Sequence, residues 1–245
     1  MEALVIIKQV VDYRVKVKVA PNGLELITDN LKKSANPFDL IALEEAIKMR
    51  EAGIITRITI VTIGGDNVRQ ILLYGLAMGA DEAVLLNTND RLNSLQISRI
   101  LCDFAKPHNY ALVMMGKQAI DSDAGQTGPM LAALMQLPQL TFVSALSINA
   151  NKCEAIRELD QGLETVSCNL PALITVDLGL NTPRIPNLIN IVKAKSKPLK
   201  TIVVTTSLPE IAAHILSYSK AKIKRECKIL PNAAAVAAVL VQHRL

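Results

Sequence analysis

The sequence is poor in aromatic residues. It has no tryptophan, and aromatic residues make up only 3% of its 245 positions, which leaves few rings for stacking on nucleic-acid bases. The formal net charge of +5 is spread along the chain and is not gathered into a basic arm that would follow a phosphate backbone. We therefore expect no nucleic-acid partner.

Metal-binding and disulfide patterns are also missing. The four cysteines are Cys102, Cys153, Cys168 and Cys227. They show neither a CxxC spacing nor a histidine partner at metal-ligand spacing, so we expect no metal site. Reduced thiols are typical of a reducing compartment.

No apolar run is long enough to span a bilayer. The most apolar late stretch, AAAVAAVLV at 233–241, is shorter than the helix that a bilayer requires. Met1 leads almost directly into the strand-like ALVIIKQV, without the features of a signal or transit peptide. We expect no direct membrane insertion, and a location in the bacterial cytoplasm rather than the mitochondrial matrix.

Short, nearly continuous apolar runs recur along the first half of the chain. They are Leu4–Ile7, Ile58–Ile63, Ala83–Leu86 and Ala111–Met115, and ALITVDL after Pro171 adds one more. Strands that are buried on both faces of a parallel sheet have this composition. Segments with helical periodicity lie between the runs, and the alternation predicts an α/β fold with a doubly wound, mostly parallel sheet.

Two of the intervening segments have clear helical patterns. One begins at Asn36, a good N-cap, followed by Pro37, whose fixed φ suits a first helical turn. Farther along it, Glu44 is placed to face Lys48. The other segment carries Ile97, Ile100, Leu101 and Phe104 on one stripe.

Two insertions interrupt this alternation, and both have the pattern of a β-hairpin. The first, at 15–28, alternates Val with Lys and turns at Asn22-Gly23, and the second, at 153–168, turns around Asp160-Gln161-Gly162. After Pro183 the sequence becomes rich in proline and lysine and then loses regular pattern until Pro231. The last apolar stretch, 232–241, predicts a helix that is apolar on every side and needs burial.

Three loops are candidates for ligand binding: 36–39, 64–67 and 116–129. Each precedes a predicted helix, where unpaired N–H groups and the helix dipole favour an anion such as phosphate. The chain has no GxxxxGK[ST] sequence, and 116–129 is not a GxGxxG turn, so neither the P-loop nor the dinucleotide fingerprint applies.

The stretch GKQAIDSDAGQTGP at 116–129 permits two interpretations. In the functional one, Gly116, Gly125 and Gly128 let the backbone approach phosphates, and Gln126 and Thr127 donate to them. Asp121 and Asp123 would then accept from ribose hydroxyls or backbone N–H groups, or help to hold a cation. In the structural one, the stretch only connects a strand to a helix, Asp123 caps that helix, and the glycines only turn the chain.

An enzymatic function has little support in the sequence. The turn Gly64-Gly65-Asp66 invites comparison with the SGGxDS loop of ATP pyrophosphatases, but Ile63 stands where that loop has its serine. His108, His214 and His243 have no nearby partner in sequence, so we expect no catalytic residues and a binding role. A stand-alone nucleotide-binding or ATP pyrophosphatase-like domain is the alternative.

Several separated segments closely resemble the small, β subunit of electron-transfer flavoprotein. They are NPFDLIALEEAIKMRE (36–51), LAMGADEAVLL (76–86), MMGKQAIDSDAGQTGPMLAALM (114–135), IRELDQGLETVSCNLPALITVDLGLNTPR (156–184) and NIVKAK (190–195). The resemblance runs in order from the first strand to about residue 202. It implies an adenine nucleotide-binding type of sheet and an electron carrier, not an enzyme.

In this family the β subunit pairs with a larger α subunit, and the heterodimer carries one FAD. The resemblance implies that it accepts electrons from acyl-CoA and other flavin dehydrogenases and passes them to a membrane quinone reductase. It also implies a structural AMP. The implied AMP contacts are Ile6, Asn36, Pro37, Phe38, Asp39, Ile63, Gly116, Lys117, Gln118, Ala119, Ile120, Asp121, Ser122, Asp123, Ala124, Gly125, Gln126 and Thr127. The FAD lies mostly on the α subunit, and Tyr13 and Phe38 of this chain are expected at its isoalloxazine edge.

The sequence departs from the family pattern in one turn, and a second question concerns which nucleotide the loop holds. Gln161 stands where the family usually has a second glycine in its R-E-x-D-G-G-x-E hairpin, which leaves the turn type open. Some relatives hold a second FAD in place of AMP and bifurcate electrons, and they tend to carry D-x-D-T-A-Q-V-G in the nucleotide loop. This chain has Asp121–Gly128 as DSDAGQTG, which favours AMP, with the bifurcating form as an alternative.

The resemblance also divides the chain into three parts. They are an α/β nucleotide-binding domain at 1–182, a partner-recognition loop at 183–200 and a C-terminal arm at 201–245 that contacts the α subunit. Within the loop, Leu188 is the expected anchor for partner dehydrogenases. Lys193, Lys195 and Lys197 are expected to steer the encounter with an acidic partner.

Overall fold

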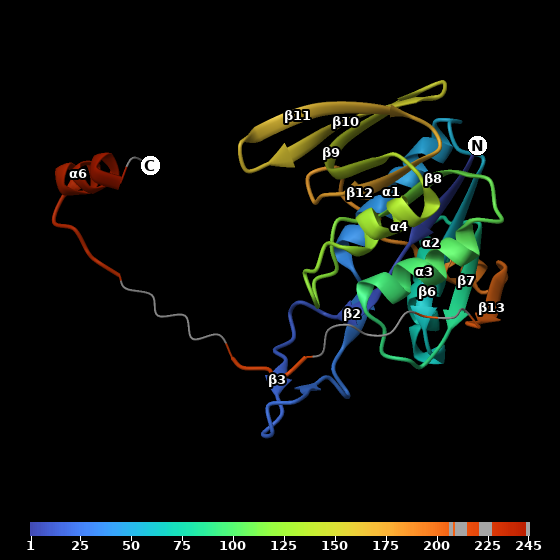
Figure 1. The fold of residues 1–245 in the computed structure, drawn as a ribbon, viewed down its shortest axis with the longest axis horizontal. Helices are drawn as coiled ribbons and strands as arrows, with labels where there is room; N and C mark the ends of the chain where they lie inside the picture. The colour runs from blue at the N-terminus through green and yellow to red at the C-terminus, as the bar shows by residue number, and fades with distance from the viewer. Residues whose placement is uncertain (206–207, 209–214, 221–226, 244–245) are drawn as a thin grey trace. The chain divides into compact units, whose positions relative to one another are not determined.

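The structure, a computed structural model, describes residues 1–205, 208, 215–220 and 227–243. The described part of the chain forms two units (Figure 1). The first unit combines residues 1–16 with 28–214, and the second combines 17–27 with 215–245. The first unit contains the central sheet and every loop that the sequence marks as a candidate ligand site.

The described residues of the first unit form a nine-stranded, mostly parallel sheet. Its strands in spatial order are β11 (Gly162–Asn169), β10 (Lys152–Leu159), β9 (Gln139–Asn149), β12 (Ala172–Val176), β8 (Tyr110–Gly116), β1 (Glu2–Ile6), β6 (Arg57–Gly64), β7 (Glu82–Asn87) and β13 (Leu199–Val203). Only the pairings of β10 with β9 and with β11 are antiparallel. The predicted α/β class with a doubly wound sheet is confirmed.

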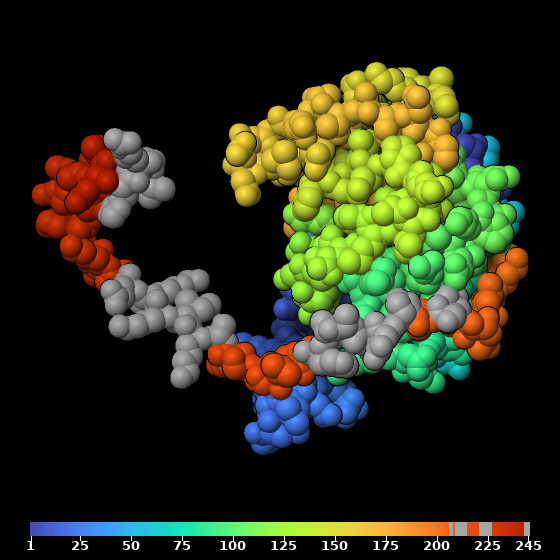
Figure 2. All heavy atoms as spheres, viewed as in Figure 1, coloured from blue at the N-terminus to red at the C-terminus, as the bar shows by residue number. Residues whose placement is uncertain are grey.

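Helices cover both faces of this sheet. They are α1 (Pro37–Glu51), α2 (Arg69–Met78), α3 (Ser94–Ala105), α4 (Thr127–Met135) and the short α5 (Leu188–Ala194), with a 3-10 turn, η1, at Asp66–Val68. Side chains of α1 and α2 pack into one apolar cluster, and those of α3 and α4 pack into a second one. The green and yellow-green atoms of α3 and α4 cover the sheet on the face shown in Figure 2.

The start of α1 agrees with its sequence pattern, but one predicted contact is wrong. Asn36 is the N-cap residue and Pro37 occupies the first turn. Glu44 does not pair with Lys48: its carboxylate is buried and binds Arg184, whose Nε lies 2.9 Å from Glu44 Oε2. A buried carboxylate gains more from a guanidinium fork than from an exposed lysine on the same helix.

Several elements of the first unit were not predicted from the sequence. The longer ones are β9, β13 and α5. Strand β9 mixes polar and apolar positions, and it contains Phe142 with a positive φ of 57°, so neither alternation nor a continuous apolar run marks it. The boundary predicted at residue 200 falls inside β13, the edge strand beside β7.

The second predicted hairpin is confirmed as β10 and β11, which pair from Lys152↔Asn169 to Leu159↔Gly162. Its turn has a positive φ at Gly162 (133°) but not at Gln161, so the side chain at 161 costs no backbone strain. Strand β11 is an edge of the sheet. The chain's four cysteines are all described and all are free thiols.

The remaining short strands form two small ribbons. In the first unit, β2 (Gln9–Val11) pairs with β5 (Lys33–Ala35). In the second unit, β3 (Lys18–Val19) pairs with β4 (Leu26–Ile27), so the first predicted hairpin has only two residues on each side. The second unit also contains α6 (Ala233–His243), which agrees with the helix predicted at 232–241.

Candidate functional site

The order of the strands creates a crevice at the middle of the sheet. Strand β1 lies between β6 and β8, and the chain continues from β1 to one side of the sheet and from β8 to the other. At such a switch point the loops after neighbouring strands diverge and leave room for a ligand. A cavity of about 410 Å³ opens there, lined by residues that follow or end β1, β6, β7 and β8.

The structure brings most of the predicted AMP contacts together around this cavity. Its walls include Ile6, Asp39, Ile63, Gly116–Ala119, Ser122 and Ala124–Thr127. The other predicted contacts, Asn36, Pro37, Phe38, Ile120, Asp121 and Asp123, do not line it. Some of these bind the loop that forms the wall, so they act behind the surface of the cavity.

The walls also contain residues that the sequence did not mark. They include Lys8, Thr62, Thr88, Asp90, Asn93 and Ser94. The loop from 88 to 94 has no glycine, so a glycine-rich pattern does not mark it. The rule that ligands bind beyond the carboxyl ends of parallel strands is the signal that would have found it, because this loop follows β7.

Asp39 ties two of the strand ends together. Its buried carboxylate accepts from the backbone N–H of Lys8 (2.9 Å) and from that of Gly116 (2.9 Å). Burial raises the pKa of Asp39 to about 7, although the two amides favour the charged form. The loops after β1 and β8 thus depend on one carboxyl group for their spacing.

Asn36 holds the next part of the same loop. Its Nδ2 donates to Gln118 O (2.9 Å) and its Oδ1 accepts from Ile120 N (3.3 Å). The side chain therefore makes no capping bond to α1. Asn36 is fully buried and does not line the cavity. Its amide therefore holds the backbone of the cavity loop from the protein interior.

The geometry of the loop explains its glycines individually. A Cβ at Gly116 would lie 2.4 Å from Phe38 Cβ and 2.6 Å from Asp39 Oδ1, so only glycine fits against the start of α1. Gly125 has a φ of 60°, in the left-handed region. Asp123 also has a positive φ and accepts from Gln118 Nε2 (2.9 Å), so it does not cap α4.

Gly128 also has a packing role. A Cβ there would lie 2.5 Å from Thr175 Cγ2 of β12. The first turn of α4 therefore approaches the sheet closely, and its backbone N–H groups have no partner within the helix. In this part of the loop Gln126 and Thr127 line the cavity.

Two lysines on the cavity walls are each paired with a carboxylate. Lys8 Nζ lies 2.8 Å from Asp121 Oδ1, and Lys117 Nζ lies 2.7 Å from Asp177 Oδ2. The Lys117 ammonium also lies 5.6 Å from the ring centroid of Phe38 and 5.7 Å from that of Phe142. These contacts keep both cations beside the cavity and give each of them a carboxylate partner.

The two residues expected near the flavin differ in exposure. Tyr13 is 73% exposed, and the guanidinium of the adjacent Arg14 lies 5.6 Å from its ring centroid. Phe38 is buried against Lys117. Of these two residues, only Tyr13 presents its ring to solvent.

The segment expected to dock dehydrogenases is apolar and exposed. Leu188 is 74% exposed, and Lys193 and Lys195 are exposed as well. Lys197 differs from the prediction: its Nζ donates to Leu76 O (3.0 Å) and Ala80 O (2.6 Å) near the end of α2. It therefore anchors the chain, and it is not free to steer a partner.

His108 is the histidine whose side chain the structure describes, and its contacts are with neighbouring residues of its own fold. The ring centroid of His108 lies 5.3 Å from that of Phe104 and 5.4 Å from that of Tyr110, and its Nδ1 lies 2.9 Å from Phe104 O. His214 and the side chain of His243 lie outside the described residues. Within the described ranges, no group of three or more His, Cys, Asp or Glu side chains could hold a metal ion. The helices that the structure describes also lack the length and apolar character of a membrane span.

Comparison with known proteins gives a consistent family. A model of the electron transfer flavoprotein domain matches residues 23–207. The mitochondrial electron transfer flavoprotein subunit beta of Arabidopsis thaliana is 46% identical over 88% of this chain and 86% of its own length. The subunit beta of Bradyrhizobium diazoefficiens is 44% identical (81% and 80%), and that of Homo sapiens is 40% identical (82% and 81%). The chain therefore belongs to the electron transfer flavoprotein family and, within it, to the beta subunits.

Proposed function

We propose that this chain pairs with an α subunit to form an electron carrier, and that its switch-point cavity holds a structural AMP. The observation that carries the nucleotide proposal is the convergence of Asp39, the loop 116–127 and the start of α4 on a single cavity. The backbone N–H groups that begin α4 suit a phosphate, and Lys8 and Lys117 lie on the same walls.

The AMP has no redox role in this proposal. It fills the cavity between strand ends and gives the loop 116–127 fixed hydrogen-bond partners, so it stabilises the fold by mass action. The electrons are carried by the FAD, which the α subunit supplies with most of its binding site. We propose that Tyr13 and Phe38 reach the flavin edge, and the exposure of Tyr13 beside Arg14 supports its part in this.

The nucleotide content of the purified heterodimer tests this proposal. We expect denaturation to release one AMP and one FAD for each heterodimer, as measured by mass spectrometry and flavin absorbance. Two FAD and no AMP would support the bifurcating alternative. A chain that retains a nucleotide and hydrolyses it without an α subunit would instead support the pyrophosphatase-like alternative.

The proposed electron path runs from acyl-CoA and other flavin dehydrogenases to a membrane quinone reductase. We propose that a dehydrogenase docks on the segment 183–195, which we call the docking segment. Its exposed apolar side chains are Ile185, Leu188, Ile189, Ile191 and Val192. A contiguous apolar surface of this kind is costly in water unless a partner covers it. Lys193 and Lys195 flank it and would speed the approach of an acidic partner, an effect that salt screens.

We also propose that α6 packs on the α subunit. All of its described side chains are at least partly exposed, and Val236, Leu240 and Val241 are among the exposed apolar ones. Truncation after Leu230 is expected to weaken heterodimer formation by tenfold or more, about 1.4 kcal/mol, while the first unit stays folded. Analytical ultracentrifugation with the α subunit measures the first effect, and circular dichroism of the truncated chain measures the second.

The truncation also has an outcome that contradicts the proposal. If the truncated chain fails to fold while the full-length chain is a folded monomer, α6 belongs to this chain's own core. In that case the α subunit binds elsewhere.

A further inference from the structure

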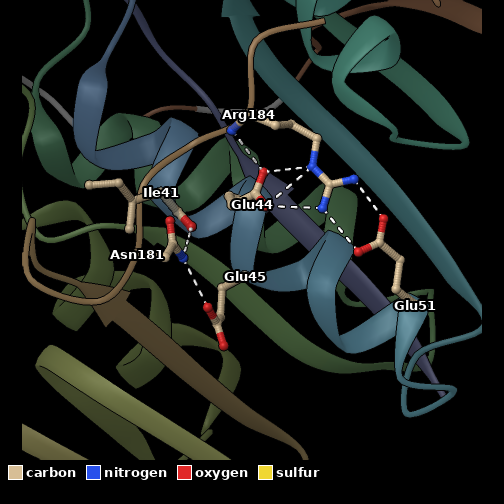
Figure 3. Close-up of polar contacts among 6 residues, drawn as sticks. All are labelled: Ile41, Glu44, Glu45, Glu51, Asn181 and Arg184. Atoms are coloured by element: carbon tan, nitrogen blue, oxygen red, sulfur yellow. Dashed lines mark hydrogen bonds and ion pairs between the residues drawn. The ribbon is translucent and has the colours of Figure 1, made fainter.

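The chain that leads from the sheet into the first part of the docking segment has no helix or strand of its own. After β12 ends at Val176, residues 177–187 run without regular structure to the start of α5. Such a segment is held in place only by the contacts of its side chains and scattered backbone groups. Two residues in it, Asn181 and Arg184, reach back to α1 (Figure 3).

Arg184 makes the larger set of contacts. Its backbone N–H donates to Glu44 Oε2 (3.0 Å), and its guanidinium binds Glu44 and Glu51 together (Figure 3). The Nε and one terminal nitrogen face Glu44 at 2.9–3.2 Å, while both terminal nitrogens face Glu51 at 2.6 and 3.0 Å. Glu51 and Glu44 raise the pKa of Arg184 above its ordinary value, so this fork stays charged.

Asn181 adds a second attachment on the same helix. Its Nδ2 donates to Ile41 O (3.1 Å) and to Glu45 Oε2 (2.9 Å), as the close-up shows (Figure 3). The two residues are three positions apart, and together they bind α1 at positions between Ile41 and Glu51. The path of the segment is therefore fixed at two points just before Ile185, where the exposed apolar surface begins.

The chain just beyond the docking segment is fixed as well. Lys197 donates to Leu76 O and Ala80 O at the end of α2, where a positive charge also interacts favourably with the helix dipole. Between these anchors, Ala194 is buried and Leu188 is exposed. Leu188 is exposed and has few contacts of its own, so its position depends on the anchors on either side of it, Arg184 and Lys197.

We propose that Arg184 is a positioning residue for docking: through Glu44 and Glu51 it holds the docking segment in the conformation that a dehydrogenase binds. The inference rests on the docking role proposed above. Arg184 does not contact the partner in this scheme. It removes the cost of ordering the segment at each encounter, which is the benefit that preorganisation gives to any interface.

The test uses the full heterodimer and an acyl-CoA dehydrogenase as electron donor. Arg184→Met keeps the bulk of the side chain and removes its charge, but it leaves the buried Glu44 carboxylate unpaired and lowers stability. The double variant Glu44→Gln/Arg184→Met removes that unpaired charge. Arg57→Met is the matched control, because it breaks an ion pair of the same length, 2.6 Å to Glu82, between β6 and β7.

We expect the KM for the heterodimer to rise about tenfold in both Arg184 variants, roughly the cost of ordering one or two side chains, with kcat unchanged. The melting temperature should fall in Arg184→Met and recover in the double variant. Chymotrypsin should cleave faster after Leu188 in both Arg184 variants. Arg57→Met should change neither KM nor that cleavage.

A KM that recovers together with the melting temperature in the double variant would overturn the inference, because Arg184 would then matter only for stability. Unchanged cleavage after Leu188 in both Arg184 variants would overturn it too. A different pair of results would contradict the docking proposal alone. Electron transfer would be unaltered in Leu188→Ala, while chymotrypsin would still cleave the Arg184 variants after Leu188 faster than it cleaves the wild type.

Discussion

Gly116→Ala is expected to destabilise the protein by about 3 kcal/mol, the upper end of the range for overpacking a dense interior. The new Cβ would lie 2.4 Å from Phe38 Cβ and 2.6 Å from the Asp39 carboxylate. Neither neighbour can move away cheaply, because both belong to the first turn of α1 and both are buried. For a chain of this size, the corresponding fall in melting temperature is about 6–12 °C.

The same substitution should also empty the nucleotide site. Asp39 accepts from Gly116 N, so displacing either group separates the loop 116–127 from the loop after β1. We expect released AMP to fall to less than about a tenth of the wild-type amount, since loss of one buried charge-assisted bond costs about 1.5–3 kcal/mol. Differential scanning calorimetry and mass spectrometry of the released nucleotide measure the two effects.

Gly179→Ala is the control for this experiment. Its Cβ would meet the end of the flexible Glu158 side chain at 3.3 Å, and its φ is not in the left-handed region. We expect stability and nucleotide content close to those of the wild type. A Gly116→Ala protein with normal melting temperature and normal AMP would mean that the first turn of α1 can yield, and that the contact of Gly116 does not organise the site.

Leu188→Ala is expected to lower kcat/KM for electron transfer from an acyl-CoA dehydrogenase about 30-fold. The estimate corresponds to about 2 kcal/mol, the threshold for an interface hot spot. Leu188 is 74% exposed in this chain, so its truncation should change the stability of the protein by less than about 0.5 kcal/mol. The flavin spectrum and the rate of reduction by dithionite should stay unchanged.

Leu163→Ala provides the matched control. Leu163 is 73% exposed and lies on β11, at the edge of the sheet, so the same atoms are removed from an equally exposed leucine. We expect its kcat/KM to equal that of the wild type. A large loss of stability in Leu188→Ala, with normal transfer for each folded molecule, would show that this leucine is part of the core and that docking occurs elsewhere.

Sequence reasoning predicted the elements whose signal is local. The buried strands β1, β6, β7, β8 and β12 are short apolar runs, and α1 starts with the Asn36-Pro37 pair. Strand β9 has no such signal, because it pairs on one side with the buried β12 and on the other with the antiparallel β10. Its residues therefore meet different environments along the strand.

The site was predictable only in part, for a similar reason. The glycine loop 116–128 and the Asn36–Asp39 turn are visible as patterns, but their mutual contacts are not. The bond from Lys8 N to Asp39 joins positions 31 apart, and the pairing of Arg184 with Glu44 joins positions 140 apart. Glu44 has a helical neighbour, Lys48, at suitable spacing, and only the tertiary structure shows that a distant arginine takes its carboxylate.

The central place of β1 has a consequence for the newly made chain. Strand β1 leaves the ribosome before both of its partners, β6 and β8, and β8 ends only at Gly116. At the usual rate of synthesis, translation from Ile6 to Gly116 takes about 5–20 s. Throughout that time an apolar strand has at least one edge without its partner, and such edges template aggregation. Chaperones should therefore bind mainly those nascent chains that do not yet extend to Gly116.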